Sequence, residues 1–296
     1  MRWNPGGRSS NLEDRRGASG GGLGGGGFGF GGGGGGGGAR LGIGGVIILA
    51  ILSAVFGRDF VSGAGGDGAP ASSVATAERA SEGGAIADPT EETLVQFMSA
   101  VLDSTQLTWH RLLPGYTDAK LVLFRDATNT ACGFGQSASG PFYCPGDQKV
   151  YVDLSFFDQL DRQFGAPGDF AQAYVIAHEI GHHVQNLTGT ERDLRRAQGQ
   201  NPGQANALSV AMELQADCYA GVWAHSAAKG GYLDPGDIDE GLGAAAAVGD
   251  DRMQKMSTGR VNPESFTHGS SAERKTWFRR GFDTGDPKQC DTFAGR

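Results

Sequence analysis

The chain has 296 residues, with 33 acidic and 25 basic side chains and a formal net charge of −8. The charge is unevenly divided, because residues 1–60 carry six arginines against three acidic residues, which leaves a net charge of about −11 for the rest. An acidic body argues against nucleic acid as the main partner, since phosphate backbones are bound by clustered lysine and arginine.

Residues 1–40 are predicted to form a disordered, glycine-rich tether. Residues 20–38 are almost entirely glycine, which loses more backbone entropy on ordering than any other residue and offers no apolar surface in return. We therefore expect a flexible tether here, and no contribution of the first sixty residues to a folded core.

A single transmembrane helix is predicted at residues 41–57. The run LGIGGVIILAILSAVF is apolar and lies between Arg40 and Arg58, and its length is close to the roughly 17–25 residues of a spanning helix. A cleaved signal peptide is the alternative, although forty residues precede the segment. Because most of the arginines precede the segment, the N-terminus is expected in the cytoplasm and the remainder outside, in the bacterial cell envelope.

Residues 58–88 are predicted to be a linker, and residues 89–296 a single folded domain. Two segments, 120–125 and 149–156, are expected to form strands. Helices are expected at 169–187, 204–228 and 237–256, with a further helix that begins at Pro89 and a last one that begins near Ser270. This order predicts an α+β fold in which helices dominate. The second strand is either an internal strand or an exposed edge that binds a substrate backbone.

Four cysteines suit an exported domain, because disulfides persist in oxidising compartments. Cys132 and Cys144 flank the segment GFGQSASGPFY and predict a hairpin tip closed by a disulfide, while Cys218 and Cys290 would tie the C-terminal tail to a central helix. Four reduced thiols are the alternative, and spacing alone does not fix the pairing.

The segment AYVIAHEIGHHVQ contains a histidine pair with metal-ligand spacing. His178 and His182 are four residues apart, so both imidazoles project from one helix face and can share a metal ion. Glu179 stands beside the first histidine, where its carboxylate can act as general base on a metal-bound water, as in the HExxH pattern of zinc peptidases. Gly181 is costly inside a helix and predicts a close helix crossing.

A catalytic zinc needs a third protein ligand and one open position. The segment ELQAD supplies Glu213 and Asp217, again four residues apart and within an apolar stretch. Two carboxylates on an apolar helix face are expensive to bury without a cation. We expect Glu213 to be the ligand and Asp217 to accept the free N–H of a ligand histidine, and the reverse assignment remains open.

The remaining histidines divide into one candidate and three structural residues. His268 lies just before the last predicted helix, where it or Arg274 could donate a hydrogen bond to the developing oxyanion; a purely structural role is equally compatible with its position. His110, His183 and His225 are expected to be structural.

These segments together resemble the bacterial neutral zinc metallopeptidases typified by YpfJ. The resemblance rests on MRWNPGGRSSNLEDRRG, CGFGQSASGPFYCPGDQKVYVDLSFF, AYVIAHEIGHHVQ, ELQADCYAGVW, THGSSAERKTWF and GDPKQCDTF. It implies a single-pass membrane protein with a zincin-like domain, with His178 and His182 as ligands and Glu179 as base. The ELQAD segment is similar to the second helix of glutamate-zincins, which favours Glu213 over Asp217.

The expected function is zinc-dependent hydrolysis of peptide bonds in a protein or peptide substrate, with Zn²⁺ and no organic cofactor. One alternative is a membrane-tethered, zinc-stabilised binding or assembly protein without turnover. Another is a metal-dependent hydrolase acting on a non-peptide amide or a cell-wall peptide. The intact Glu179 favours an enzyme, because a purely structural zinc needs no base.

Overall fold

The computed structural model describes residues 1–17 and 89–294. The glycine tract at residues 20–38, the predicted membrane span at residues 41–57 and the linker at residues 58–88 lie outside the described residues. Among the helices of the two described ranges, none is both long enough and apolar enough to cross a bilayer.

The main sheet has four strands in the order β1-β2-β6-β5. The first three strands run parallel, and β5 at one edge runs antiparallel to β6. A second sheet is the antiparallel pair β3–β4. The strands are β1 (Leu12–Asp14), β2 (Lys120–Phe124), β3 (Ala127–Thr130), β4 (Gly133–Gln136), β5 (Phe142–Cys144) and β6 (Lys149–Asp153).

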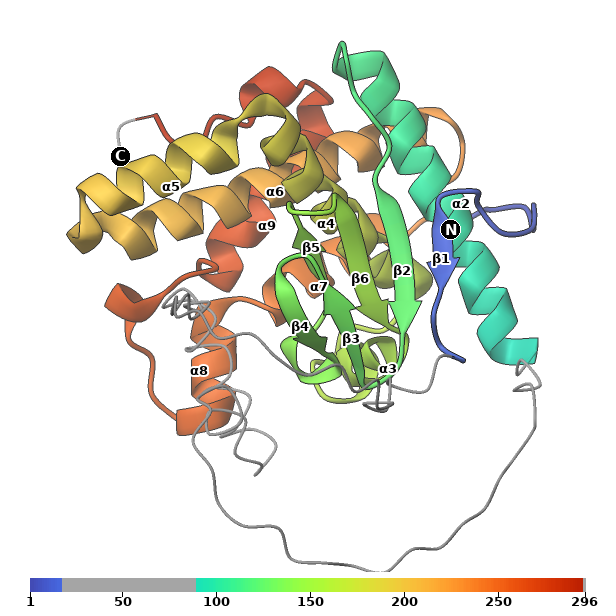
Figure 1. Ribbon diagram of the computed structural model, residues 1–296, viewed down its shortest axis with the longest axis horizontal. Helices are drawn as coiled ribbons and strands as arrows, with labels where there is room; N and C mark the ends of the chain where they lie inside the picture. Colours follow the sequence, from blue (N-terminus) through green and yellow to red (C-terminus); the bar gives the residue numbers. More distant parts are fainter. Residues whose placement is uncertain (18–88, 295–296) are drawn as a thin grey trace, which may run out of the picture.

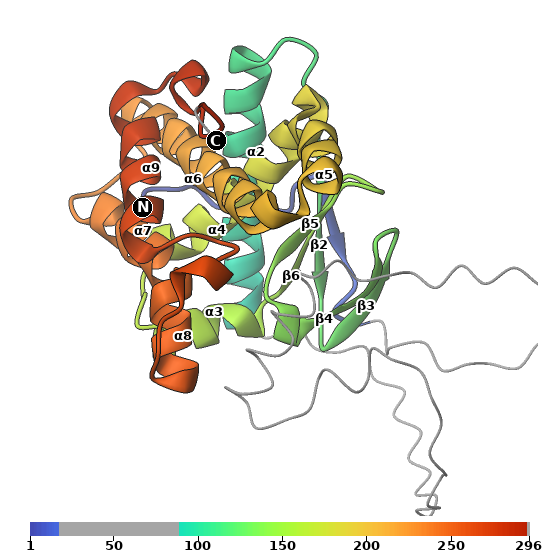
Figure 2. The ribbon, with the colours of Figure 1, turned by 90° about the vertical axis from the view of Figure 1, so that its left-hand side faces the viewer.

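Helices form the larger part of the domain, which makes the described fold a helix-dominated α+β structure with small sheets. The strands gather on one side, α6, α7 and α9 lie on the other, and α4 runs between them (Figures 1 and 2). The helices are α2 (Pro89–Leu112), α3 (Ser155–Arg162), α4 (Asp169–Thr188), α5 (Thr190–Gln200), α6 (Ala205–Lys229), α7 (Asp237–Ala247), α8 (Asp250–Thr258) and α9 (Ser271–Thr284).

The core surrounds α4, which is buried over most of its length. Two glycines allow its neighbours to pack closely. A Cβ at Gly181 would lie 3.0 Å from the carbonyl oxygen of Ala216, so this glycine permits the close crossing of α4 and α6, as predicted. A Cβ at Gly281 would lie 1.9 Å from the carbonyl oxygen of Cys218, so the α6–α9 crossing depends on glycine even more strongly.

Two predicted elements differ from those observed: one is shorter and one is divided in two. The predicted strand 149–156 stops at Asp153, because the Asp153 carboxylate accepts the backbone N–H of Ser155 and α3 begins there. The predicted helix 237–256 is divided into α7 and α8, because Gly249 is extended and the N–H of Asp250 donates to the carbonyl of Gly269.

The prediction that the first sixty residues contribute nothing to the folded core is wrong for residues 1–17. Strand β1 pairs with β2 along one edge of the main sheet, and the ring of Trp3 packs against Phe97 at a centroid distance of 5.4 Å. The glycine tract begins only after this segment, which has apolar side chains of its own.

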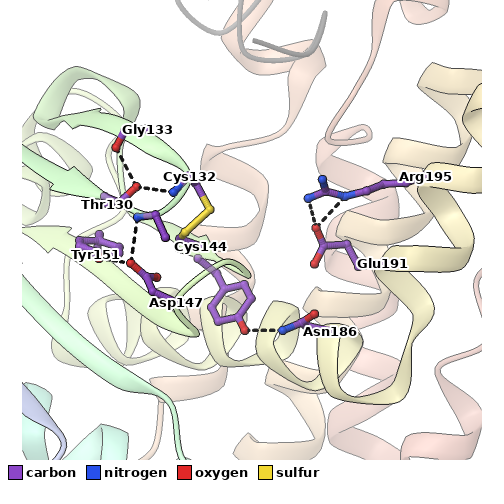
Figure 3. The surroundings of a disulfide bond; sticks show 11 residues. Thr130, Cys132, Gly133, Cys144, Asp147, Tyr151, Asn186, Glu191 and Arg195 are labelled. Carbon is purple, nitrogen blue, oxygen red and sulfur yellow. Dashed lines mark hydrogen bonds and ion pairs between the residues drawn. A yellow bond between two sulfur atoms is a disulfide. The ribbon is translucent and has the colours of Figure 1, made fainter. Parts of the chain in front are cut away.

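Both predicted disulfides are present, Cys132–Cys144 and Cys218–Cys290. The expected hairpin between Cys132 and Cys144 is absent. Residues 133–136 pair with β3, whereas residues 142–144 pair with β6. The first disulfide therefore joins the small sheet to the free edge of the main sheet, close to Asp147 and Thr130 (Figure 3).

Candidate metal centre

Helices α4 and α6 cross at Gly181 and bring together three side chains that could hold a metal ion. The Nε2 atom of His178 lies 3.3 Å from Glu213 Oε2, and the Nε2 atom of His182 lies 3.5 Å from Glu213 Oε1. Ligand atoms of these three residues all lie within 4.8 Å of one another. The predicted ligands therefore converge on one point, and Glu213 rather than Asp217 is the carboxylate that faces both histidines.

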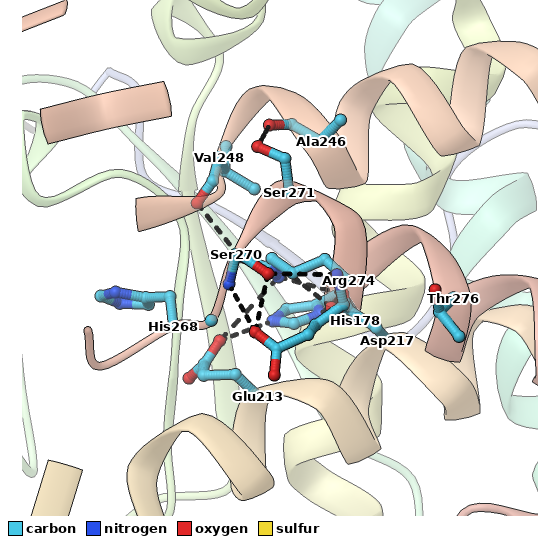
Figure 4. Close-up of polar contacts among 12 residues, drawn as sticks. His178, Glu213, Asp217, Ala246, Val248, His268, Ser270, Ser271, Arg274 and Thr276 are labelled. Carbon is cyan, nitrogen blue, oxygen red and sulfur yellow. Dashed lines mark hydrogen bonds and ion pairs between the residues drawn. The ribbon is translucent and has the colours of Figure 1, made fainter. Parts of the chain in front are cut away.

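Asp217 lies behind His178, where it accepts a hydrogen bond. Its Oδ1 atom is 2.9 Å from His178 Nδ1, and it is fully buried. The guanidinium of Arg274 on α9 pairs with the same carboxylate through Nε at 2.8 Å and Nη2 at 3.0 Å (Figure 4). Tyr174, one turn before His178, donates its hydroxyl to Asp217 as well.

The second histidine is oriented by a neighbour on its own helix. The Nδ1 atom of His182 lies 2.8 Å from the side-chain oxygen of Gln185, whose amide donates to the carbonyl of Met212 on α6. Both histidines thus have their Nδ1 atoms hydrogen-bonded and their Nε2 atoms directed at Glu213, an arrangement that suits metal binding through Nε2.

The charges of the buried carboxylates are set by their surroundings. Burial alone would raise the pKa of Glu213, but the charge of His182 and the hydrogen bond from His178 hold it well below its usual value. Burial also opposes the ionisation of Asp217, yet Arg274 and His178 lower its pKa. Both groups are therefore acceptors in the ionised form at neutral pH.

Glu179 lines a cavity next to the two histidines and Glu213, and its environment differs from theirs. Burial raises its pKa, and His182 and His178 oppose this shift only in part. A carboxylate with a raised pKa is a better proton acceptor than an ordinary one, which suits a general base. The cavity has a volume of about 560 Å³ and is also lined by His178, His182 and Glu213.

His268 lines the same cavity from the loop before α9. Its Nδ1 atom lies 3.2 Å from Asp250 Oδ1, while Asp250 Oδ2 accepts the backbone N–H groups of Thr267, His268 and Gly269 at 2.6–3.0 Å. Burial would lower the pKa of His268, but Asp250 and Glu213 raise it overall. Arg274, the alternative donor, is 3% exposed and engaged with Asp217.

The sequence matches, over residues 1–293, the model of a family described as "putative neutral zinc metallopeptidase". The chain belongs to this zinc metallopeptidase family. Within it, the chain is 49% identical to the uncharacterized protein YpfJ of Escherichia coli (strain K12), in an alignment of 302 positions that covers 99% of each protein. It is 51% identical to the uncharacterized protein Rv2575 of Mycobacterium tuberculosis (strain ATCC 25618 / H37Rv), over 203 residues that cover 65% of this chain and 68% of that protein. No solved structure matches significantly.

In this member of the zinc metallopeptidase family, three residues that support the candidate centre were not predicted from the sequence. Tyr174 stands four residues before His178 on the same helix face, so its spacing could have indicated it. Gln185 follows His182 by three residues, which is also a same-face spacing. Asp250 had no such signal, because only the tertiary fold brings α8 to the loop before α9.

The histidines expected to be structural lie apart from the metal centre. His183 is fully buried, with Nε2 at 2.7 Å from the carbonyl of Thr117 and Nδ1 at 2.9 Å from the hydroxyl of Tyr143. His225 contacts the carbonyl of Phe282 at 2.7 Å. Both rings are thus held by contacts elsewhere in the fold, and neither histidine lines the cavity.

Proposed function

We propose that the chain is a zinc-dependent peptidase in which Glu179 is the general base. The observation that carries the proposal is the convergence of His178, His182 and Glu213 on one point beside a cavity that also contains Glu179. Three protein ligands with an open side are typical of catalytic zinc, whereas structural sites are closed by four.

The donor set fits zinc. Two imidazole nitrogens and one carboxylate are the ligands of several catalytic zinc sites, and each histidine here has its other nitrogen held by a hydrogen bond. Bound zinc would supply a Lewis acid and lower the pKa of a coordinated water. The ionised Glu213 would neutralise part of the charge of the metal.

Glu179 would accept the proton of the attacking water and deliver it to the leaving amine. Burial raises its pKa, which favours acceptance of the proton in the first transfer. His268, oriented by Asp250, would donate a hydrogen bond to the oxygen of the scissile carbonyl as negative charge develops there.

The substrate would enter as an extended peptide beside β5. The alternative considered for strand 149–156, an exposed edge, is wrong, because β6 lies between β2 and β5. The outer strand on the cavity side is β5, and the cavity is lined by Pro141, Phe142 and Tyr143 at this strand. A peptide could therefore bind by β-augmentation at β5, with its side chains directed toward α5 across the cavity.

The test uses the full chain in detergent, because residues 1–17 belong to the folded domain. Zinc content and cleavage of a mixed peptide library are measured for the parent and for Glu179→Gln, with Glu264→Gln as the matched control, since Glu264 is exposed and does not line the cavity. We expect one zinc in each protein and turnover at least about 100-fold lower in Glu179→Gln alone.

The same experiment addresses the non-enzymatic alternative. One zinc per chain with no cleavage by any of the three proteins would favour a zinc-stabilised binding protein. Cleavage retained by Glu179→Gln would contradict the assigned base.

A further inference from the structure

Residues 1–17 contact the body of the domain through backbone hydrogen bonds. Strand β1 pairs with β2 in the register Leu12 with Leu121 and Asp14 with Leu123. The pairing continues beyond the strand, because the N–H of Arg15 donates to the carbonyl of Leu123 at 2.7 Å. Segment 1–17 therefore completes one edge of the main sheet.

The arginines of this segment are all paired with acidic side chains. Arg2 donates to Asp234 at 2.7 Å, and Arg8 contacts both Asp14 and Glu92. The other two pairs follow the same pattern: Arg15 contacts Glu13 at 2.7 Å, and Arg16 contacts Glu91 at 2.9 Å. Four of the six arginines in residues 1–60 thus have partners within the folded domain.

The segment also reaches the helix that carries the histidines. The amino group of Met1 lies 2.8 Å from both carboxylate oxygens of Asp169, the first residue of α4, and 3.4 Å from Asp237 at the start of α7. Its side chain is 6% exposed. Lys149 on β6 adds a contact of 2.8 Å to Glu13. These contacts therefore reach α4, α7 and β6, in addition to the contacts with β2 and α2.

We infer that residues 1–17 are an integral part of the native domain and lie on the same side of any membrane as the candidate metal centre. Strand hydrogen bonds and ion pairs of about 3 Å cannot form across a hydrocarbon layer of about 30 Å. The inference holds whether the segment comes from the same chain or from a second copy, and it does not depend on peptidase activity.

This placement conflicts with the expected single crossing between residues 41 and 57. One crossing would put residues 1–17 and residues 89–294 on opposite sides of the membrane. The expected orientation rested on the arginines before that segment. Since Arg2, Arg8, Arg15 and Arg16 serve as ion-pair partners within the domain, they no longer indicate a cytoplasmic N-terminus. The two disulfides place the shared side in an oxidising compartment.

Single-cysteine labelling of the full chain in bacterial spheroplasts tests this placement. Ser10→Cys and Asn201→Cys provide exposed probes in segment 1–17 and in the body, and the parent chain measures the background from its disulfide-bonded cysteines. We expect a membrane-impermeant maleimide to label both probes before permeabilisation. Labelling of both only after permeabilisation would still place them together. Labelling of Asn201→Cys alone would overturn the inference.

Carbodiimide cross-linking of the unmodified full chain tests the docking itself. This zero-length reagent should join Glu13 to Lys149, whose charged atoms are 2.8 Å apart, and Glu13→Gln should abolish the product. The linked peptide found in monomeric protein indicates docking within one chain, and the linked peptide found in a covalent dimer indicates docking between copies. Absence of the linked peptide from both would contradict the inference.

Discussion

The Nδ1 atom of His178 and the Oδ1 atom of Asp217 are 2.9 Å apart across the crossing of α4 and α6. This contact fixes the ring of His178 so that Nε2 faces Glu213, and it requires the close helix approach that Gly181 permits. The geometry of the metal centre thus depends on a buried carboxylate that is itself held by Arg274 from a third helix.

Asp217→Asn should weaken zinc binding by about 10- to 100-fold, because the ligand histidine loses its charged partner. Glu213→Gln should weaken it more, since a ligand is lost. Zinc affinity by competition with a chelating dye measures both, and Asp193→Asn on the exposed face of α5 is the control. Full affinity in Glu213→Gln together with loss in Asp217→Asn would reverse the assignment of the two carboxylates.

His268→Ala should lower kcat by about 100-fold or more while KM and zinc content change little, because the donor acts on charge that develops only in the transition state. Steady-state kinetics on a peptide found by library cleavage gives the separate values. His110→Ala provides the control, since His110 is half exposed and pairs with Asp118 away from the cavity. Unchanged kcat in His268→Ala would remove this role.

The two disulfides should differ in their contributions to stability. The Cys218–Cys290 bond joins residues 72 positions apart, and the Cys132–Cys144 bond joins residues 12 positions apart. From loop-closure entropy, we expect the free energy of unfolding to fall by about 4 kcal/mol when Cys218 and Cys290 are replaced by serine, and by about 3 kcal/mol when Cys132 and Cys144 are. Chemical denaturation of the two double variants measures the losses. A larger loss from the shorter loop would show that entropy of the unfolded chain does not dominate.

The docking of residues 1–17 should have an acid-sensitive component. The hydrogen bond from Lys149 lowers the pKa of Glu13 from 4.5, against burial and with the help of Arg15. The pKa of Glu13 is lower in the folded state than in the unfolded state. Its contribution to stability is therefore complete at pH values above the unfolded-state pKa, and it is lost as the pH falls through the folded-state pKa.

Glu13→Gln should therefore lower the melting temperature by about 2 °C at neutral pH, and the difference should narrow in the acid range. Calorimetry across the pH range measures it, with the exposed Glu264→Gln as control. A difference that stays constant down to the lowest pH at which the protein remains folded would refute the role of the Glu13 charge.

The local patterns of the sequence were sufficient to predict the elements that carry the site. Four-residue spacing placed His178 with His182 and Glu213 with Asp217, and the cost of glycine in a helix indicated the crossing at Gly181. These predictions succeed because they depend on one helix at a time, or on a single contact between two helices.

The parts that sequence patterns missed depend on contacts between distant segments. Nothing local to Asp250 shows that it will accept three backbone N–H groups from the loop before α9. Strand β1 is only three residues long and lies before a glycine tract, so its pairing with β2 is decided by the partner strand and by ion pairs such as Arg16 with Glu91.

The most direct test of the central claim is the zinc content of the full chain in two neighbouring variants. His182→Ala removes a proposed ligand, whereas His183→Ala removes a buried histidine whose ring contacts Thr117 and Tyr143. We predict one zinc per chain in the parent and in His183→Ala, and none in His182→Ala. Equal zinc in all three proteins, or none in the parent, would contradict the metal centre described for α4 and α6.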